Sequence, residues 1–256
     1  MPDMWIRSTS VGSSGACRSE RPLTHPAKLA ACLLAVVSLG WVLPAAGQVA
    51  PSPAEIAAYA GLHAAAQRGD VPTIRRLAGA TPGALGERDA RGRTPLHVAT
   101  FARQRAAVLA LLSAGADPAA LDHDRYDAVT IAAVADDEES LRVLLANGAS
   151  ASLVTSRYDG TALIAAAHLG HDGVVRQLIA SGAPLDHVNN LHWTALIEAV
   201  VLGDGGARHQ RVVRDLLVAG ADARLTDRGG DTPLQLARAR GYRAMVQMLE
   251  RVARKP

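Results

Sequence analysis

Two histidines lie where they could do chemistry, His63 in "GLHAAAQRGD" and His97 in "RGRTPLHVAT". A histidine can act as a general acid or base, or it can hold a turn in place. The segment recurs along the chain, and the other copies carry Thr130, Ile164, Ile197 or Gln235 at the same place. A catalytic role would not tolerate such exchange, so we predict that both histidines are structural.

No other pattern in the sequence supports catalysis. There is no G-x-S-x-G elbow and no H-E-x-x-H, and the two cysteines, Cys17 and Cys32, lie near the N-terminus. The Gly-rich segment 202–211 is not preceded by a strand or followed by Lys-Ser/Thr, so it is not a P-loop. Its Asp204 and His209 do not have metal-ligand spacing with His171. We predict no catalytic residue, no metal and no cofactor.

These histidines belong to a repeat. A threonine or aspartate recurs at the start of each copy, with spacings of 33, 34, 33 and 38 residues, and we call these positions the repeat marks: Thr94, Asp127, Thr161, Thr194 and Thr232. A glycine follows the first three marks after 21 residues and the fourth after 26, which places a five-residue insertion between Thr194 and Gly220. Threonine and proline begin a helix well, and a glycine ends one. Each period therefore predicts two short helices, such as 95–102 and 105–113.

The period, the "TPLH" segment and the "GAD" helix ends resemble the ankyrin repeat over about residues 60–254. The resemblance implies an all-α solenoid of helix–turn–helix repeats joined by hairpin fingers, in which each repeat needs its neighbours to bury its apolar face. It also implies that the histidine of the motif bonds backbone around the turn. The expected repeats lie near residues 60–92, 93–125, 126–159, 160–192, 193–230 and 231–254.

The first 47 residues are typical of a secretory signal. Lys28 precedes an apolar run from Leu29 to Leu43, and small residues then indicate cleavage after Gly47. Residues 48–59 would form a short linker and the start of an N-terminal cap. Lipidation at Cys32 and an uncleaved anchor are the alternatives. We expect a periplasmic or secreted protein with no stable membrane anchor after cleavage.

The charge of the remaining chain is nearly balanced. The chain has 27 basic and 24 acidic residues, and four of the basic and two of the acidic residues lie in the signal segment. The remaining 23 basic and 22 acidic residues give a net charge of +1. A nucleic-acid partner calls for a concentrated basic field, which is absent here. We expect a monomer that binds protein and not nucleic acid.

The finger tips are the first candidate for a binding surface, because stacked repeats align them in a row. Arg, Tyr and Trp are enriched in binding hot spots. The row holds Arg91, Arg93, Arg125, Tyr126, Arg157, Tyr158, His192, Trp193 and Arg228. The alternative is that the arginines pair with Asp124, Asp159 or Asp231 and that the aromatics lie on neighbouring fingers.

The inner helix face is the second candidate. Glu198 stands where other repeats carry Val98, Ile131, Ala165 and Leu236. A carboxylate at an apolar position is either a partner contact or the partner of a nearby arginine, and the sequence leaves both open. The insertion at 202–211 is the third candidate.

Together these observations predict non-catalytic protein binding outside the cytoplasm, through the fingers and the concave helix face. Two alternatives remain: a scaffold or protective partner dedicated to one periplasmic enzyme, and a secreted factor that binds a host protein. A further alternative is an enzyme with an unrecognised site, which an activity lost on Glu198→Gln would support.

Overall fold

The structure of the protein is a computed structural model that describes residues 48–81 and 83–253. The predicted signal segment, 1–47, lies outside the described residues. Within them, no helix is long and apolar enough to cross a membrane.

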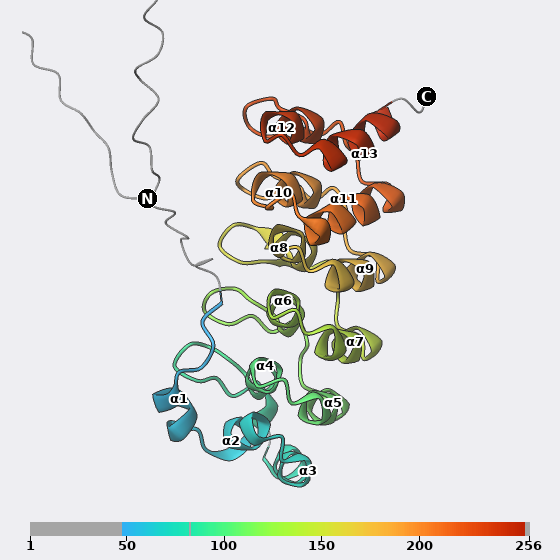
Figure 1. Cartoon of the computed structure of the whole chain (residues 1–256). Coiled ribbons are helices and arrows are strands. Elements are labelled where there is room, and N and C mark those ends of the chain that lie inside the picture. The colour runs from blue at the N-terminus through green and yellow to red at the C-terminus, as the bar shows by residue number, and fades with distance from the viewer. Residues whose placement is uncertain (1–47, 82, 254–256) are drawn as a thin grey trace, which may run out of the picture. The chain divides into compact units, whose positions relative to one another are not determined.

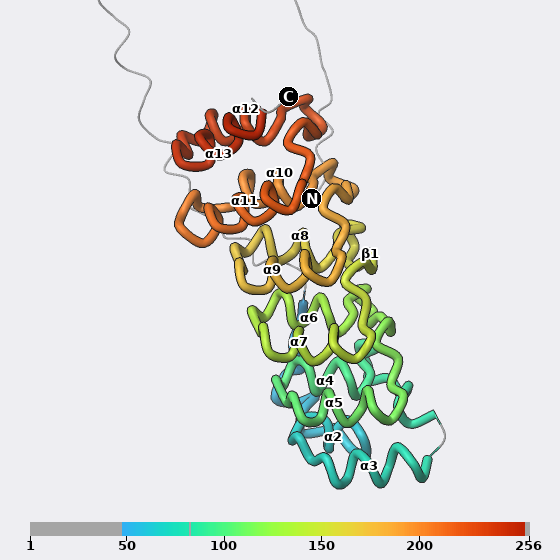
Figure 2. Tube along the Cα trace, turned by 90° about the vertical axis from the view of Figure 1, so that its right-hand side faces the viewer, coloured from blue at the N-terminus to red at the C-terminus, as the bar shows by residue number. Residues whose placement is uncertain are grey.

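The described chain is a stack of helix pairs. After the short α1 (Pro53–Ala58), inner and outer helices alternate along the chain. The inner row contains α2 (Gly61–Arg68), α4 (Pro95–Phe101), α6 (Ala128–Val134), α8 (Ala162–Leu169), α10 (Ala195–Val201) and α12 (Pro233–Ala239). The outer row contains α3 (Val71–Ala80), α5 (Arg105–Ser113), α7 (Glu138–Ala146), α9 (Asp172–Ala180), α11 (Ala207–Ala219) and α13 (Arg243–Ala253). Each helix contacts its counterpart in the next pair, so the two rows run side by side (Figures 1 and 2).

The helices begin and end where the repeat marks predict. The side chains of Asp127, Thr161 and Thr194 each accept a hydrogen bond from a backbone N–H three residues later. Gly115 follows α5 with φ 95°, a left-handed conformation that costs glycine little. Helix α5 spans the expected residues, and α4 ends one residue earlier than expected.

Small and branched side chains fill the space between the two rows. Ala99, Leu111, Ala132 and Leu163 are fully buried, and similar residues extend this core through every helix pair. Alanine allows inner helices to approach closely, whereas leucine and valine fill the space to the outer row. The all-α fold is confirmed.

The fingers are the connections between one outer helix and the next inner helix: finger 1 (87–93), finger 2 (116–126), finger 3 (149–160), finger 4 (183–193) and finger 5 (221–231). They are built mainly from turns. Within the described chain, the ladder pairing is limited to finger 3, where β1 (Val154–Thr155) lies antiparallel to β2 (Gly160–Thr161). Each finger needs only a short antiparallel turn to hold its shape, because it also contacts the neighbouring fingers.

The insertion lengthens an outer helix. Helix α11 has 13 residues, whereas α5, α7 and α9 have nine. The preceding turn packs tightly, since a Cβ on Gly203 would lie 2.1 Å from the carbonyl oxygen of Ala199. The extra length is therefore ordered, and it brings Arg208 and Arg211 to the N-terminal end of α11.

Candidate functional site: the finger row

One side chain organises the tip turn in four of the fingers. The Oδ1 atom of Asp89, Asp122, Asn189 or Asp227 accepts hydrogen bonds from backbone N–H groups two and four residues later, at 2.8–3.0 Å. Asx side chains stabilise turns in this way. The "DHD" segment at 122–124 is therefore turn chemistry.

Backbone hydrogen bonds then join one tip to the next. The N–H of His123 donates to the carbonyl of Arg91 at 2.9 Å, and that of Ser156 to the carbonyl of Arg125 at 2.8 Å. The N–H of Asn190 donates to the carbonyl of Tyr158 at 3.0 Å. The first four tips therefore form a continuous row whose backbone is fixed before any partner binds.

The two candidate histidines hold this row to the inner helices. The backbone N–H of Thr94 donates to Nδ1 of His97 at 3.0 Å, so Nε2 carries the proton and donates to the carbonyl of Tyr126 at 3.0 Å. Nε2 of His63 lies 2.9 Å from the carbonyl of Arg93 in the same way. Burial lowers the pKa of His97 to about 4, so its ring is neutral at pH 7. This neutral, fully bonded ring has the predicted structural role.

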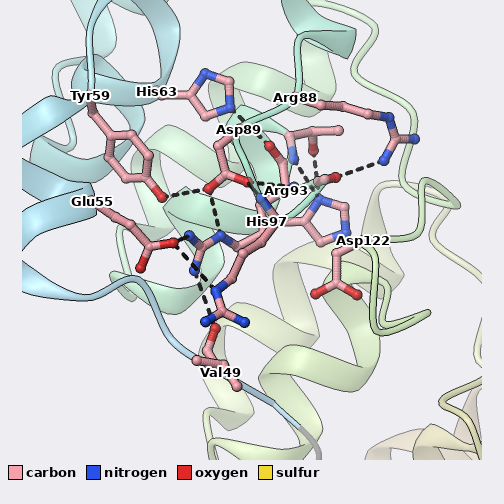
Figure 3. A network of polar contacts seen from close by, with 12 residues as sticks. Val49, Glu55, Tyr59, His63, Arg88, Asp89, Arg93, His97 and Asp122 are labelled. Atoms are coloured by element: carbon pink, nitrogen blue, oxygen red, sulfur yellow. Dashed lines mark hydrogen bonds and ion pairs between the residues drawn. The ribbon is translucent and has the colours of Figure 1, made fainter.

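Arg93 lies inside a polar network that connects finger 1 to α1 (Figure 3). Its guanidinium contacts Glu55 at 2.5 Å and Asp89 at 2.6 Å, and it donates to the carbonyl of Val49 at 3.2 Å. The hydroxyl of Tyr59 donates to the same Asp89 carboxylate at 2.8 Å. The buried charge is thus neutralised by two acids.

Three sequence-predicted contact residues prove to be interior residues, and we correct those predictions. Arg93, Tyr126 and Glu198 are only 0, 6 and 4 % exposed. Arg93 is covered through its contacts with α1, Tyr126 belongs to the buried side of finger 2, and Glu198 faces the interior of the inner row. None of them can be reached by a partner in this structure.

The exposed tip arginines mostly form ion pairs with other parts of the chain. Arg125 contacts Asp159 at 3.0 Å and Arg157 contacts Asp124 at 3.1 Å, so fingers 2 and 3 exchange two ion pairs. Arg91 lies 3.4 Å from Glu55. Such half-exposed pairs contribute little energy but fix the side chains in place. Arg228 differs, because its guanidinium donates to the carbonyl of Asn190 and contacts no described carboxylate.

The aromatic tip residues divide between the surface and the interior. Tyr158 and His192 are exposed, and Trp193 is partly buried. Three further large apolar side chains on fingers 3 and 4 are exposed, namely Val154, Val188 and Leu191. Sequence reasoning missed the valines and Leu191, although Val154 and Val188 directly precede the buried Thr155 and Asn189.

Glu198 has an unusual environment. Its Oε1 accepts a hydrogen bond from Nδ2 of Asn189 at 3.0 Å, whereas its buried Oε2 has no hydrogen bond and lies 3.5 Å from Nδ1 of His168. Burial raises the pKa of Glu198 to about 7, and the bond from Asn189 offsets this only in part. The sequence left open whether Glu198 pairs with a nearby arginine. Its described contacts include no arginine, and it accepts a hydrogen bond from Asn189 instead.

The insertion has a bracing role in this structure. Nδ1 of His209 lies 2.8 Å from Asp204 and its Nε2 lies 2.9 Å from the carbonyl of His168. Arg208 contacts Asp136 at 2.8 Å and Asp172 at 3.2 Å, and so reaches across two neighbouring repeats. In the part of the chain that the structure describes, no three His, Cys, Asp or Glu side chains gather as a metal site would require.

Comparisons with known proteins agree with this geometry. The family model described as ankyrin repeats in three copies matches residues 52–122 and 129–227. The chain is 37 % identical over 186 residues to the ankyrin repeat protein YahD of Escherichia coli (strain K12), covering 72 % of this chain and 92 % of YahD. The chain belongs to the ankyrin-repeat family.

Solved structures share the same stack. An ankyrin repeat domain from Acinetobacter baumannii AYE, ABAYE2397, matches with a TM-score of 0.71 and 43 % identity, covering 75 % of this chain and 97 % of that domain. A chain in the complex of the endopeptidase Bd0816 from Bdellovibrio bacteriovorus with immunity protein Bd3460 matches with a TM-score of 0.63, over 75 % of this chain and 98 % of that one. At 22 % identity, this second likeness shows the fold alone. Ankyrin repeats are typically non-catalytic and bind other proteins.

Proposed function

We propose that this protein acts outside the cytoplasm as a non-catalytic binding module for a protein partner. The observation that carries the proposal is the finger row, whose backbone is fixed by tip turns and by hydrogen bonds between fingers. A preorganised surface loses little conformational entropy when a partner docks, so its exposed side chains contribute more fully to affinity. Ankyrin repeats in general support protein binding.

The extracytoplasmic location rests on the sequence of residues 1–47, with its apolar run and its small residues before Gln48. The test is the N-terminal sequence of the protein purified from its source organism, together with its distribution between cytoplasmic and envelope fractions. A mature chain that begins at Gln48 outside the cytoplasm would support the proposal. An unprocessed chain in the cytoplasm would contradict it.

The first candidate is a general protein-binding module. A scaffold or protective partner of a periplasmic enzyme is the second candidate, and the occurrence of this fold in a complex with an endopeptidase favours it. A secreted factor that binds a host protein is the third.

The binding test uses the full-length chain with a C-terminal tag, expressed in the source organism and captured from detergent-free envelope extract. A matched capture uses an unrelated tagged protein with the same leader. A protein that co-purifies in fixed proportion with this chain alone, and not with the unrelated control, supports a dedicated partner. A broad mixture indicates a general adaptor. No protein in envelope, medium or host extracts would refute the binding function.

A further inference from the structure

Exposed apolar side chains are concentrated on two adjacent fingers. Among the described residues, nine large apolar side chains are exposed, and four of them lie on fingers 3 and 4. Fingers 1, 2 and 5 contribute none. The four are between 39 and 44 % exposed, and we call them the apolar patch: Val154, Tyr158, Val188 and Leu191. Exposed apolar side chains that cluster, unlike single ones, mark interaction sites.

Three hydrogen bonds join the two fingers that carry the patch. The backbone N–H of Asn190 donates to the carbonyl of Tyr158 at 3.0 Å, so Leu191 follows a residue that is bonded directly to Tyr158. The side-chain amide of Asn190 donates to the carbonyl of Arg157 at 3.0 Å, and Nε2 of His187 lies 2.6 Å from the carbonyl of Asp159. Val154 directly precedes the buried Thr155, and Val188 directly precedes the buried Asn189.

One cation beside the patch, Arg228, is available to a carboxylate of the partner. Arg125 and Arg157 are engaged by Asp159 and Asp124, so they add no net charge at the surface. Arg228 on finger 5 reaches the carbonyl of Asn190 at 3.0 Å, next to Leu191, and forms no ion pair with a described carboxylate. A guanidinium can bind a carboxylate through two parallel N–H groups, and Arg228 has donors to spare after its one bond.

We propose that fingers 3 and 4 dock a loop of the partner protein that presents aliphatic or aromatic side chains beside an aspartate or glutamate. The apolar side chains cover the patch and the carboxylate pairs with Arg228. This inference rests on the proposed binding function and specifies its partner chemistry. It places the docking site at the C-terminal half of the finger row, away from the Arg93 network on finger 1.

The test selects peptides from a random-peptide phage library on the intact purified protein. The patch variant carries Tyr158→Ser and Leu191→Ser. A matched control carries Leu109→Ser and Val218→Ser, which remove exposed apolar side chains (45 and 82 % exposed) from outer helices α5 and α11. Circular dichroism and urea unfolding confirm that both variants are folded. A third variant, Arg228→Gln, keeps a donor for the carbonyl of Asn190 but removes the charge.

The expected result is a set of peptides that combine apolar residues with Asp or Glu. Their affinity should fall at least about tenfold on the patch variant and remain unchanged on the control, a difference of about 1.4 kcal/mol. On Arg228→Gln, only the carboxylate-bearing peptides should weaken. Equal binding to patch variant and control, or failure to select any peptide, overturns the assignment of the patch. Peptides without acidic residues, or indifferent to Arg228→Gln, overturn the acidic partner.

Capture from extract separates this inference from the function on which it rests. A native partner retained by the patch variant would leave protein binding intact and refute docking at fingers 3 and 4. Absence of any captured protein with the unaltered chain would refute the binding function itself, whatever the peptides show.

Discussion

Replacing Glu198 by glutamine should stabilise the protein above neutral pH. In the folded chain, burial raises the pKa of Glu198 to about 7, compared with 4.5 for an ordinary glutamate. Below pH 4.5 the Glu198 carboxyl is protonated in both the folded and the unfolded chain, so its contribution to stability is fully present. As the pH rises, the unfolded chain ionises first, and stability is lost until the folded carboxyl also ionises near pH 7.

The magnitude follows from the difference between the two pKa values. A difference of about 2.5 corresponds to about 3 kcal/mol, and little solvent screening applies because the side chain is almost completely buried. Glutamine keeps an oxygen that can accept the bond from Asn189, and its amide group cannot ionise. The free energy of unfolding of Glu198→Gln should therefore exceed that of the unaltered protein by about 3 kcal/mol at pH 8, and by less than about 1 kcal/mol at pH 5.

The assay is urea unfolding followed by circular dichroism at pH 5 and pH 8. Glu139→Gln is the control, because Arg142 beside that exposed glutamate lowers its pKa and no such gain is expected. A gap between Glu198→Gln and the unaltered protein that does not widen with pH would refute the reasoning. In that case His168, 3.5 Å from Oε2, would be supplying a proton and a compensating charge.

Four further predictions follow from the same contacts. His97→Gln should reduce the loss of stability on acidification from pH 6.5 to 4.5 by about 2 kcal/mol in urea unfolding, because the buried neutral ring resists a proton that the unfolded chain accepts. His192→Gly should raise stability by up to about 1 kcal/mol, since φ is 64° there, and His192→Ala should not; equal effects would show that the backbone conformation is not strained. Arg93→Ala leaves Asp89 without its cation and Glu55 with only Arg91, so it should cost about 3 kcal/mol and release α1 to fast hydrogen exchange; unchanged protection of α1 would contradict the network. Arg208→Gln should speed hydrogen exchange in α6 and α7 but not in α4, and equal exchange in all three would show that the link to Asp136 carries no stability.

The helices could be predicted from the sequence because their ends depend on local chemistry. Thr161 and Thr194 cap the helices that follow them, and Gly115, 21 residues after Thr94, follows α5 with a positive φ. The five-residue insertion could be counted in the same way. That it would lengthen α11 could not be predicted, because added residues can extend either a turn or a helix.

The burial of the tip residues depends on contacts that are remote in sequence. Arg93 and Tyr126 each lie four residues after the side chain that stabilises the tip turn, Asp89 or Asp122. This shared spacing was the signal in the sequence that the two side chains point in the same direction. The cover over Arg93 comes from Glu55, which no spacing rule connects to finger 1. The sequence did not decide whether Glu198 is buried, because a position that is apolar in other repeats can lie either in the core or on a binding surface.

The reach of Arg208 changes how the stack would come apart. In an ordinary repeat array each unit holds only its immediate neighbours, so an unfolding front advances one unit at a time. Here the longer α11 ties Asp136 and Asp172, which belong to the two preceding units, to a single side chain. A protease or translocase that pulls from the C-terminal end would remove α12 and α13 without touching this tie. The next step would have to break both ion pairs of Arg208 as well as the packing of α11, so three units are affected together.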